Sequence, residues 1–160
     1  MLIIVCGLPG SGKTTLARAL ARNLGGVHVS SDLTRKRLFP KPAYSEDEKA
    51  RVYGEMASEC EKALREGRDV IVDATFHKKA VRERFLAMDA KVFTILCILP
   101  EGNVEERLAR RKRGGPSDAD FGVYLKMRGE WERLETPHLA LDTSTPLRRQ
   151  VAEAMAHIGR

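Results

Sequence analysis

The chain has 160 residues, 42% of them apolar, and a formal net charge of +6 at pH 7. This length fits one domain, and the apolar fraction is enough to bury a core. No apolar run approaches the roughly 20 residues that span a bilayer, so we expect a soluble, cytoplasmic protein with no membrane partner. The positive charge suits an anionic ligand, either a nucleotide or a nucleic acid.

The first half of the chain alternates apolar runs with amphipathic segments. Residues 2–6 form a β-branched run closed by glycine, which is typical of a buried parallel strand. Ser45 and Glu48 have the spacing of a capping box at the start of a long helix. We expect a strand at 2–6, a helix at 14–24, a strand at 27–30, a helical turn and loop at 32–44, and a helix at 45–65.

The second half continues the alternation. Thr145 and Pro146 are expected to cap and start the last helix. We expect strands at 70–73, 91–99 and 138–142, and helices at 78–88, 101–112, 119–134 and 145–158. Strands that alternate with helices predict an α/β three-layer sandwich with a parallel sheet, built as one domain over residues 1–160.

The segment from Gly7 to Thr14 reads Gly-Leu-Pro-Gly-Ser-Gly-Lys-Thr and matches the phosphate-loop pattern G-x-x-x-x-G-K-[ST]. Its glycines let backbone N–H groups face phosphates, and the following helix adds its positive N-terminal end. Lys13 would reach the β- and γ-phosphates of ATP, while the Thr14 hydroxyl would hold Mg²⁺. The residues expected to contact the nucleotide are Gly7, Pro9, Gly10, Ser11, Gly12, Lys13, Thr14, Thr15 and Thr143.

Several classes of phosphate-loop protein are excluded by missing features. The chain has no Asn-Lys-x-Asp tetrad of a guanine-specific GTPase and no glycine-rich signature of a transporter ATPase. It is also too short for the helical lid domain of a ring-forming ATPase. The compact nucleoside and polynucleotide kinases remain.

Two aspartates end apolar strands on the side where parallel-sheet sites form. Asp32 can orient an acceptor hydroxyl and take its proton, and Arg35, three residues on, can clamp an anion on the acceptor. Asp73 has the Walker-B-like place that supports Mg²⁺ together with Thr14. The plainer alternatives are a helix cap for Asp32, a surface charge for Arg35 and a structural role for Asp73.

The densest basic run predicts a lid over ATP at about residues 107–120. Arg107 and Arg111 are four residues apart and share a helix face, so both can point inward and neutralise charge on the transferred phosphoryl group. Arg110 would lie about 100° to the side. A solvated helix end is the alternative. The polar loop that begins at Asp142 could line the adenine pocket.

These motifs together resemble those of the zeta-toxin and polynucleotide-kinase-like P-loop kinases, also described as AAA-type kinases. The resemblance covers nearly the whole chain and is carried by residues 7–14, 29–32 with Arg35, 70–75 with Arg82, 106–111 and 141–144. It implies the strand order 2-3-1-4-5 and a short lid. It further implies Asp32 as general base, Arg35 as an acceptor contact, and Arg107 and Arg111 as lid arginines.

The motifs do not identify the acceptor. Asp73-Ala74-Thr75 is followed by Phe76, whereas polynucleotide kinases commonly have asparagine at this position. The hypothesis that we favour from the sequence is a kinase of nucleic acid 5′-hydroxyl ends. The cations that favour it are Lys36, Arg37, Lys41, Lys78, Lys79 and Arg82. A second hypothesis is a small-molecule kinase with a pocket built by Phe39, Tyr44, Tyr53 and Phe76. A third is an ATP-binding regulator or toxin-like protein with slow ATP hydrolysis.

Overall fold

The computed structural model describes residues 1–110 and 119–160. Its sheet consists of β1 (Leu2–Cys6), β2 (Val27–Ser30), β3 (Val70–Asp73), β4 (Val92–Ile98) and β5 (Leu139–Asp142). All neighbouring strands run parallel, in the order β2-β3-β1-β4-β5. The α/β fold and the strand order implied by the resemblance are therefore confirmed. In this register Ser30 and Val5 both lie opposite Asp73, so the carboxyl ends of these strands meet at one edge.

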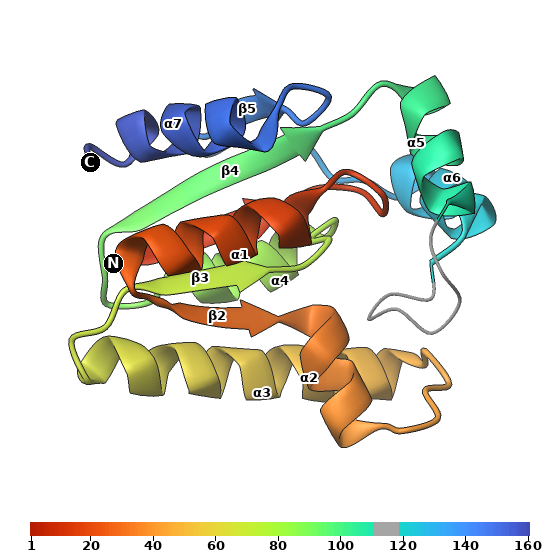
Figure 1. Cartoon of the computed structure of the whole chain (residues 1–160). Helices are drawn as coiled ribbons and strands as arrows, with labels where there is room; N and C mark the ends of the chain where they lie inside the picture. Colours follow the sequence, from red (N-terminus) through yellow and green to blue (C-terminus); the bar gives the residue numbers. More distant parts are fainter. Residues whose placement is uncertain (111–118) are drawn as a thin grey trace.

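Helices cover both faces of the sheet (Figure 1). They are α1 (Lys13–Leu24), α2 (Ser31–Leu38), α3 (Glu46–Arg65), α4 (Lys79–Leu86), α5 (Glu101–Ala109), α6 (Phe121–Gly129) and α7 (Leu147–His157). Leu2 and Ile4 point into the core under α3 and α4, while Ile3 and Val5 point into the core under α1 and α7. Because β1 is buried on both sides, it is apolar throughout.

Among the described helices, α5 and α6 lie beyond the carboxyl end of β4, apart from the two layers (Figure 1). Leu99, Val104, Leu108 and Tyr124 form a small apolar cluster between them. No described helix combines the length and the apolarity that crossing a membrane requires.

Two of the expected helices differ from the structure at three ends. The helix expected at 119–134 begins at Phe121, capped by the Asp120 carboxylate, and ends at Gly129, because the chain beyond it bonds elsewhere. The Glu132 N–H, for example, donates to the His77 carbonyl at 2.9 Å. Thr145 does not cap the last helix, which begins after Pro146; its hydroxyl donates to the Asp142 carbonyl at 2.8 Å instead.

The capping box predicted for α3 forms in part. Ser45 Oγ accepts from the Glu48 N–H at 3.2 Å, as expected. The Glu48 carboxylate reaches further back than a capping box requires and accepts from the N–H groups of Ala43 and Tyr44, at 2.7 to 3.0 Å. Glu48 thereby fixes the loop between α2 and α3, which lies beside the carboxyl ends of the strands.

Candidate active site

The phosphate loop joins β1 to α1, and its backbone conformation requires glycine at two positions. Gly12 caps α1 in the left-handed region at φ 82°, which glycine adopts without steric cost. A side chain at Gly7 would bring its Cβ within 2.6 Å of the Cys97 carbonyl oxygen on β4. The loop is therefore fixed against the sheet with its N–H groups at the start of a helix, which is an arrangement that binds anions.

Polar groups of the loop are buried and have hydrogen-bonding capacity to spare. Ser11 Oγ is buried and has no hydrogen-bond partner among the described residues. The Lys13 side chain is 9% exposed, and its ammonium group donates to the Leu8 carbonyl at 3.3 Å. A phosphate group would satisfy both side chains, since it offers several strong acceptor oxygens.

Thr14 and Asp73 meet at the edge of the sheet. The Thr14 hydroxyl donates to Asp73 Oδ1 at 2.8 Å, and His28 Nε2 bonds the other carboxylate oxygen. Hydroxyl and carboxylate oxygens are hard donors that suit Mg²⁺, which commonly binds one or two carboxylates together with substrate phosphates. In the described residues no group of three or more His, Cys, Asp or Glu side chains forms an all-protein metal cage. The donor set therefore fits a metal ion held jointly with a nucleotide.

Asp32 and Arg35 both lie on α2, directly after the end of β2. The Arg35 guanidinium stacks over the Tyr44 ring at 5.0 Å and lies 3.8 Å from the Glu48 carboxylate. The Nη1 atom makes this contact with Glu48; it is buried, and at this distance it has no hydrogen-bond partner in the described part of the chain. A buried guanidinium N–H without an acceptor is costly, so this side chain is poised to bind an anion.

Tyr53, from α3, lies beside this pair. Burial raises its pKa to about 12; a hydrogen bond with the Phe76 backbone and the charge of Arg35 oppose the rise, and the Asp32 carboxylate adds to it. Asp32 and Arg35 therefore both act on the pKa of the Tyr53 hydroxyl. The structure brings together Asp32, Arg35, Tyr44 and Tyr53, but it places Phe76 as a core residue rather than at the surface of a pocket.

Phe76 follows β3 in the left-handed region, at φ 53°, and is completely buried. Asparagine tolerates this conformation better than phenylalanine does. The aromatic ring compensates by packing against Tyr53 and Phe85, with ring centroids 5.7 and 5.1 Å away. The position at which polynucleotide kinases commonly have asparagine is thus occupied here by a buried phenylalanine in the apolar core.

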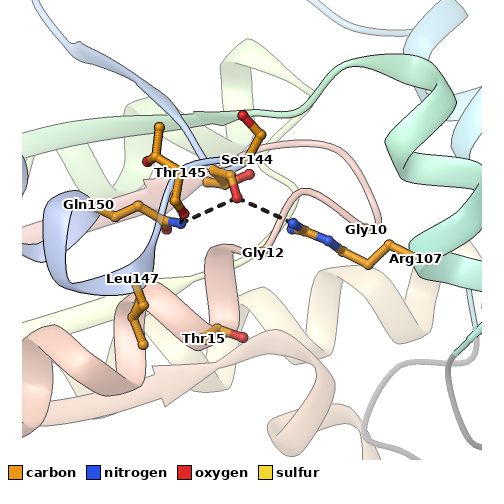
Figure 2. A pocket seen from close by; sticks show the side chains of 9 residues that line it. Gly10, Gly12, Thr15, Arg107, Ser144, Thr145, Leu147 and Gln150 are labelled. Atoms are coloured by element: carbon orange, nitrogen blue, oxygen red, sulfur yellow. Dashed lines mark hydrogen bonds between the residues drawn. The ribbon is translucent and has the colours of Figure 1, made fainter.

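A cavity of about 360 Å³ opens beside the phosphate loop, between the start of α1, helix α5 and the loop after β5 (Figure 2). Its lining residues are Gly10, Gly12, Thr15, Arg107, Thr143, Ser144, Thr145, Leu147 and Gln150. Arg107 and Gln150 approach from opposite sides, and both donate to the Thr143 carbonyl at 3.2 Å. The Thr143 hydroxyl in turn donates to the Ser11 carbonyl at 2.7 Å, which ties this cavity to the phosphate loop.

Leu147 and Gln150 were not among the sequence-predicted site residues. Gln150 is 6% exposed and donates to the carbonyls of Thr143 and Thr145. The sequence could have indicated Gln150 as a site residue, because it lies one turn into the last helix, close to the loop that follows β5. Of the expected lid, Arg107 lies at the cavity and Arg110 is exposed beside Glu106. Arg111 and residues 112–118 lie outside the described part of the chain.

Three of the six cations proposed to attract a nucleic acid are paired with acidic side chains. Lys78 lies 3.4 Å from Glu132, and Lys79 lies 2.7 Å from Glu135. Arg37 reaches both Glu55 and Glu59, at 3.2 and 3.3 Å. Arg82, which the sequence suggested as a flanking cation, is buried and bonds main-chain carbonyls instead.

Residues 2–134 match the AAA_33 family model, described as an AAA domain, and the chain belongs to this family. It is 30% identical, over 175 aligned residues, to an uncharacterised protein of Mycobacterium tuberculosis. That alignment covers 99% of this chain and 34% of the relative, so the chain spans about a third of the relative's length.

Several solved structures share the fold. A sugar kinase from Janibacter sp. superposes with a TM-score of 0.79 at 18% identity, covering 98% of this chain and 93% of that one. A gluconokinase from Sinorhizobium meliloti gives 0.73 at 21% identity, covering 99% and 91%. The APS kinase of Mycobacterium tuberculosis in complex with AMPPNP and APS gives 0.73 at 20% identity, covering 99% and 97%. The chain therefore has a P-loop kinase fold.

Proposed function

We propose that the protein is an ATP-dependent phosphotransferase that moves the γ-phosphoryl group to a hydroxyl acceptor. The observation that carries the proposal is the meeting of three segments at one edge of the sheet. Thr14 of the phosphate loop bonds Asp73, Asp73 lies opposite Ser30, and Asp32 follows two residues later. Donor phosphates and an acceptor hydroxyl can thus be held side by side, which is the arrangement that phosphoryl transfer requires.

The nucleotide occupies the two joined parts of the site. Its base enters the cavity of about 360 Å³, and its phosphates follow the N–H groups from Gly7 to Thr14. Lys13 contacts the terminal phosphates, and Arg107 of α5, which lies beside Gly12, adds positive charge to the transferred group. Thr14 and Asp73 would hold Mg²⁺, which would supply positive charge against the phosphates.

The acceptor enters from the side of α2. Asp32 accepts the proton of the attacking hydroxyl and so raises its nucleophilicity. Arg35 donates to an anionic group of the acceptor; its Nη1 atom lies 3.8 Å from Glu48 Oε2 and has no hydrogen-bond partner among the described residues. A full set of cation, base and loop favours transfer over the slow hydrolysis of an ATP-binding regulator.

For the acceptor we propose a small anionic metabolite bearing a hydroxyl. A groove for a polymer would need exposed, unpaired cations, whereas Lys78, Lys79 and Arg37 are neutralised by glutamates. The sugar kinase, gluconokinase and APS kinase with the same fold are consistent with a small acceptor. A polynucleotide-kinase-like member of the family, which phosphorylates 5′-hydroxyl ends, is the competing assignment, favoured by the net charge of +6.

One assay distinguishes these acceptors. The protein is incubated with γ-³²P-ATP and Mg²⁺, in parallel with a panel of anionic hydroxy metabolites and with a 5′-hydroxyl oligonucleotide. We expect label in at least one metabolite and none in the oligonucleotide. Label in the oligonucleotide alone would establish the polynucleotide assignment. Label only in free phosphate, unaffected by any acceptor, would favour the regulator.

A further inference from the structure

His28 contacts the site although no motif includes it. It lies on β2, and its Nε2 atom bonds Asp73 Oδ2 on the neighbouring strand β3. The two side chains are 14% and 2% exposed. Asp73 Oδ1, the other carboxylate oxygen, accepts from the Thr14 hydroxyl at 2.8 Å. A continuous chain of side chains therefore joins β2 to the phosphate loop.

The strand register explains this contact. His28 lies opposite Ile71 and Ser30 lies opposite Asp73, so the side chains of these four residues point to the face of the sheet that α1 covers. From this position the imidazole, which is longer than the serine side chain, reaches along the sheet to the carboxylate at the strand end. Thr14 at the start of α1 approaches the same carboxylate from above the sheet.

The two bonds hold the carboxylate in one orientation. A carboxylate that is 2% exposed must receive hydrogen bonds, and here each oxygen has its own donor. With Oδ2 held by His28, Oδ1 remains directed at Thr14. The hydroxyl proton of Thr14 is then committed to Asp73, and the lone pairs of its oxygen are left for a cation.

We propose that His28 is a positioning residue of the metal–nucleotide site, acting through Asp73 on the Thr14 oxygen. This inference rests on the proposed function, in which Thr14 and Asp73 hold Mg²⁺ beside the phosphates. Groups that orient a metal-binding shell typically change metal affinity about 10- to 100-fold when they are removed. The same loss is expected here, while contacts between the loop and metal-free nucleotide persist.

The test measures Mn²⁺ affinity in the presence of ADP by electron paramagnetic resonance, and ADP affinity in EDTA by calorimetry. His28→Leu removes the donor at similar size, and His28→Gln restores an N–H at a similar reach. Val29→Ala, on the same strand but in the opposite core, controls for lost packing. If His28→Leu does not fold, His28→Asn replaces it, because its amide is too short to reach Asp73.

We expect His28→Leu to weaken Mn²⁺ binding about 10-fold or more and to change ADP binding in EDTA less than about twofold. His28→Gln should recover most of the Mn²⁺ affinity, and Val29→Ala should keep it despite a lower melting temperature. Equal Mn²⁺ affinity in His28→Leu and the unsubstituted protein would overturn the inference about His28 but not the proposed function. If the unsubstituted protein bound no Mn²⁺ with ADP, both the inference and the proposed function would fall.

Discussion

Arg82 donates from Nη1 to the carbonyl oxygen of Phe76 at 2.7 Å, and this bond holds the chain where it leaves β3. Nη2 of the same guanidinium donates to the carbonyls of Glu132 and Arg133, at 2.9 and 3.0 Å. Arg82 is 3% exposed. It therefore holds the segment after α6 against the chain that follows β3. These bonds indicate a structural role rather than a role in attracting nucleic acid.

Replacing Arg82 should lower stability. We expect Arg82→Met to reduce the free energy of unfolding by about 3 kcal/mol, because three carbonyls lose a charged donor. Arg84→Met, on the exposed side of the same helix, is the control and should stay within about 0.5 kcal/mol. Urea unfolding measures both. Normal stability of Arg82→Met with reduced transfer would instead make Arg82 a substrate contact.

Lys13→Ala should abolish transfer while the protein stays folded. The ammonium group is expected to stabilise charge on the transferred phosphoryl group, and the loss of one such donor lowers rates by about 10²-fold or more. Its bond to Leu8 is long, at 3.3 Å, so little stability should be lost. Circular dichroism and the transfer assay check the two parts. Transfer at the normal rate in this variant would exclude the assigned role of the loop.

Arg107 and Arg110, at the end of α5, allow a test variant and a matched control. Arg107 lines the cavity and bonds Thr143, whereas Arg110 is exposed and paired with Glu106. Arg107→Met should therefore lower the transfer rate by about 10²-fold, while Arg110→Met should stay within about twofold. Single-turnover kinetics at saturating ATP make the comparison. Similar losses in both variants would point to general electrostatic attraction instead of a specific contact.

The three cysteines should be inert in the folded protein. Burial raises the pKa of Cys6, Cys60 and Cys97 from 9.0 to about 12, so these thiols stay protonated and unreactive near neutral pH. We expect no labelling by a thiol reagent at pH 8 in the folded state and labelling of all three in denaturant.

The same pKa shifts predict the pH dependence of stability. An unfolded chain releases thiol protons above pH 9 that the folded chain keeps until about pH 12, so stability should decline across that interval. Urea unfolding at pH 8.5 and 10.5 should differ by about 2 kcal/mol or more. Cys60→Ala should make this decline less steep, because one of the three contributing thiols is removed. A constant free energy of unfolding up to pH 10.5 would contradict the assigned burial.

The sequence predicted the fold well because its strands are short apolar runs; three of them end in aspartate or directly before glycine, and residues 70–73 were placed without error. The strand order came from the family resemblance and is confirmed. Helix ends were less predictable, because tertiary bonds decide them. The hydroxyl of Thr145 bonds a nearby carbonyl instead of a helix N–H, and Gly129 ends α6 where Arg82 captures the following segment.

Residues that act through distant contacts could not be predicted. His28 and Asp73 are 45 positions apart and meet only because β2 and β3 are neighbours in register. An arginine such as Arg82 is normally expected at the surface. Here it is buried, because its hydrogen-bond partners lie 6, 50 and 51 positions away in the sequence. The motif residues of the phosphate loop were predictable because their chemistry depends on local spacing alone.

Replacing Asp32 tests the proposed kinase activity most directly. Asp32→Asn keeps the size of the side chain but cannot accept the hydroxyl proton. We predict that ATP affinity stays within about threefold, while single-turnover transfer to the metabolite identified in the panel falls by about 10²-fold or more. Transfer at the normal rate in Asp32→Asn, or a parallel loss of ATP affinity, would contradict the assignment of Asp32 as the base.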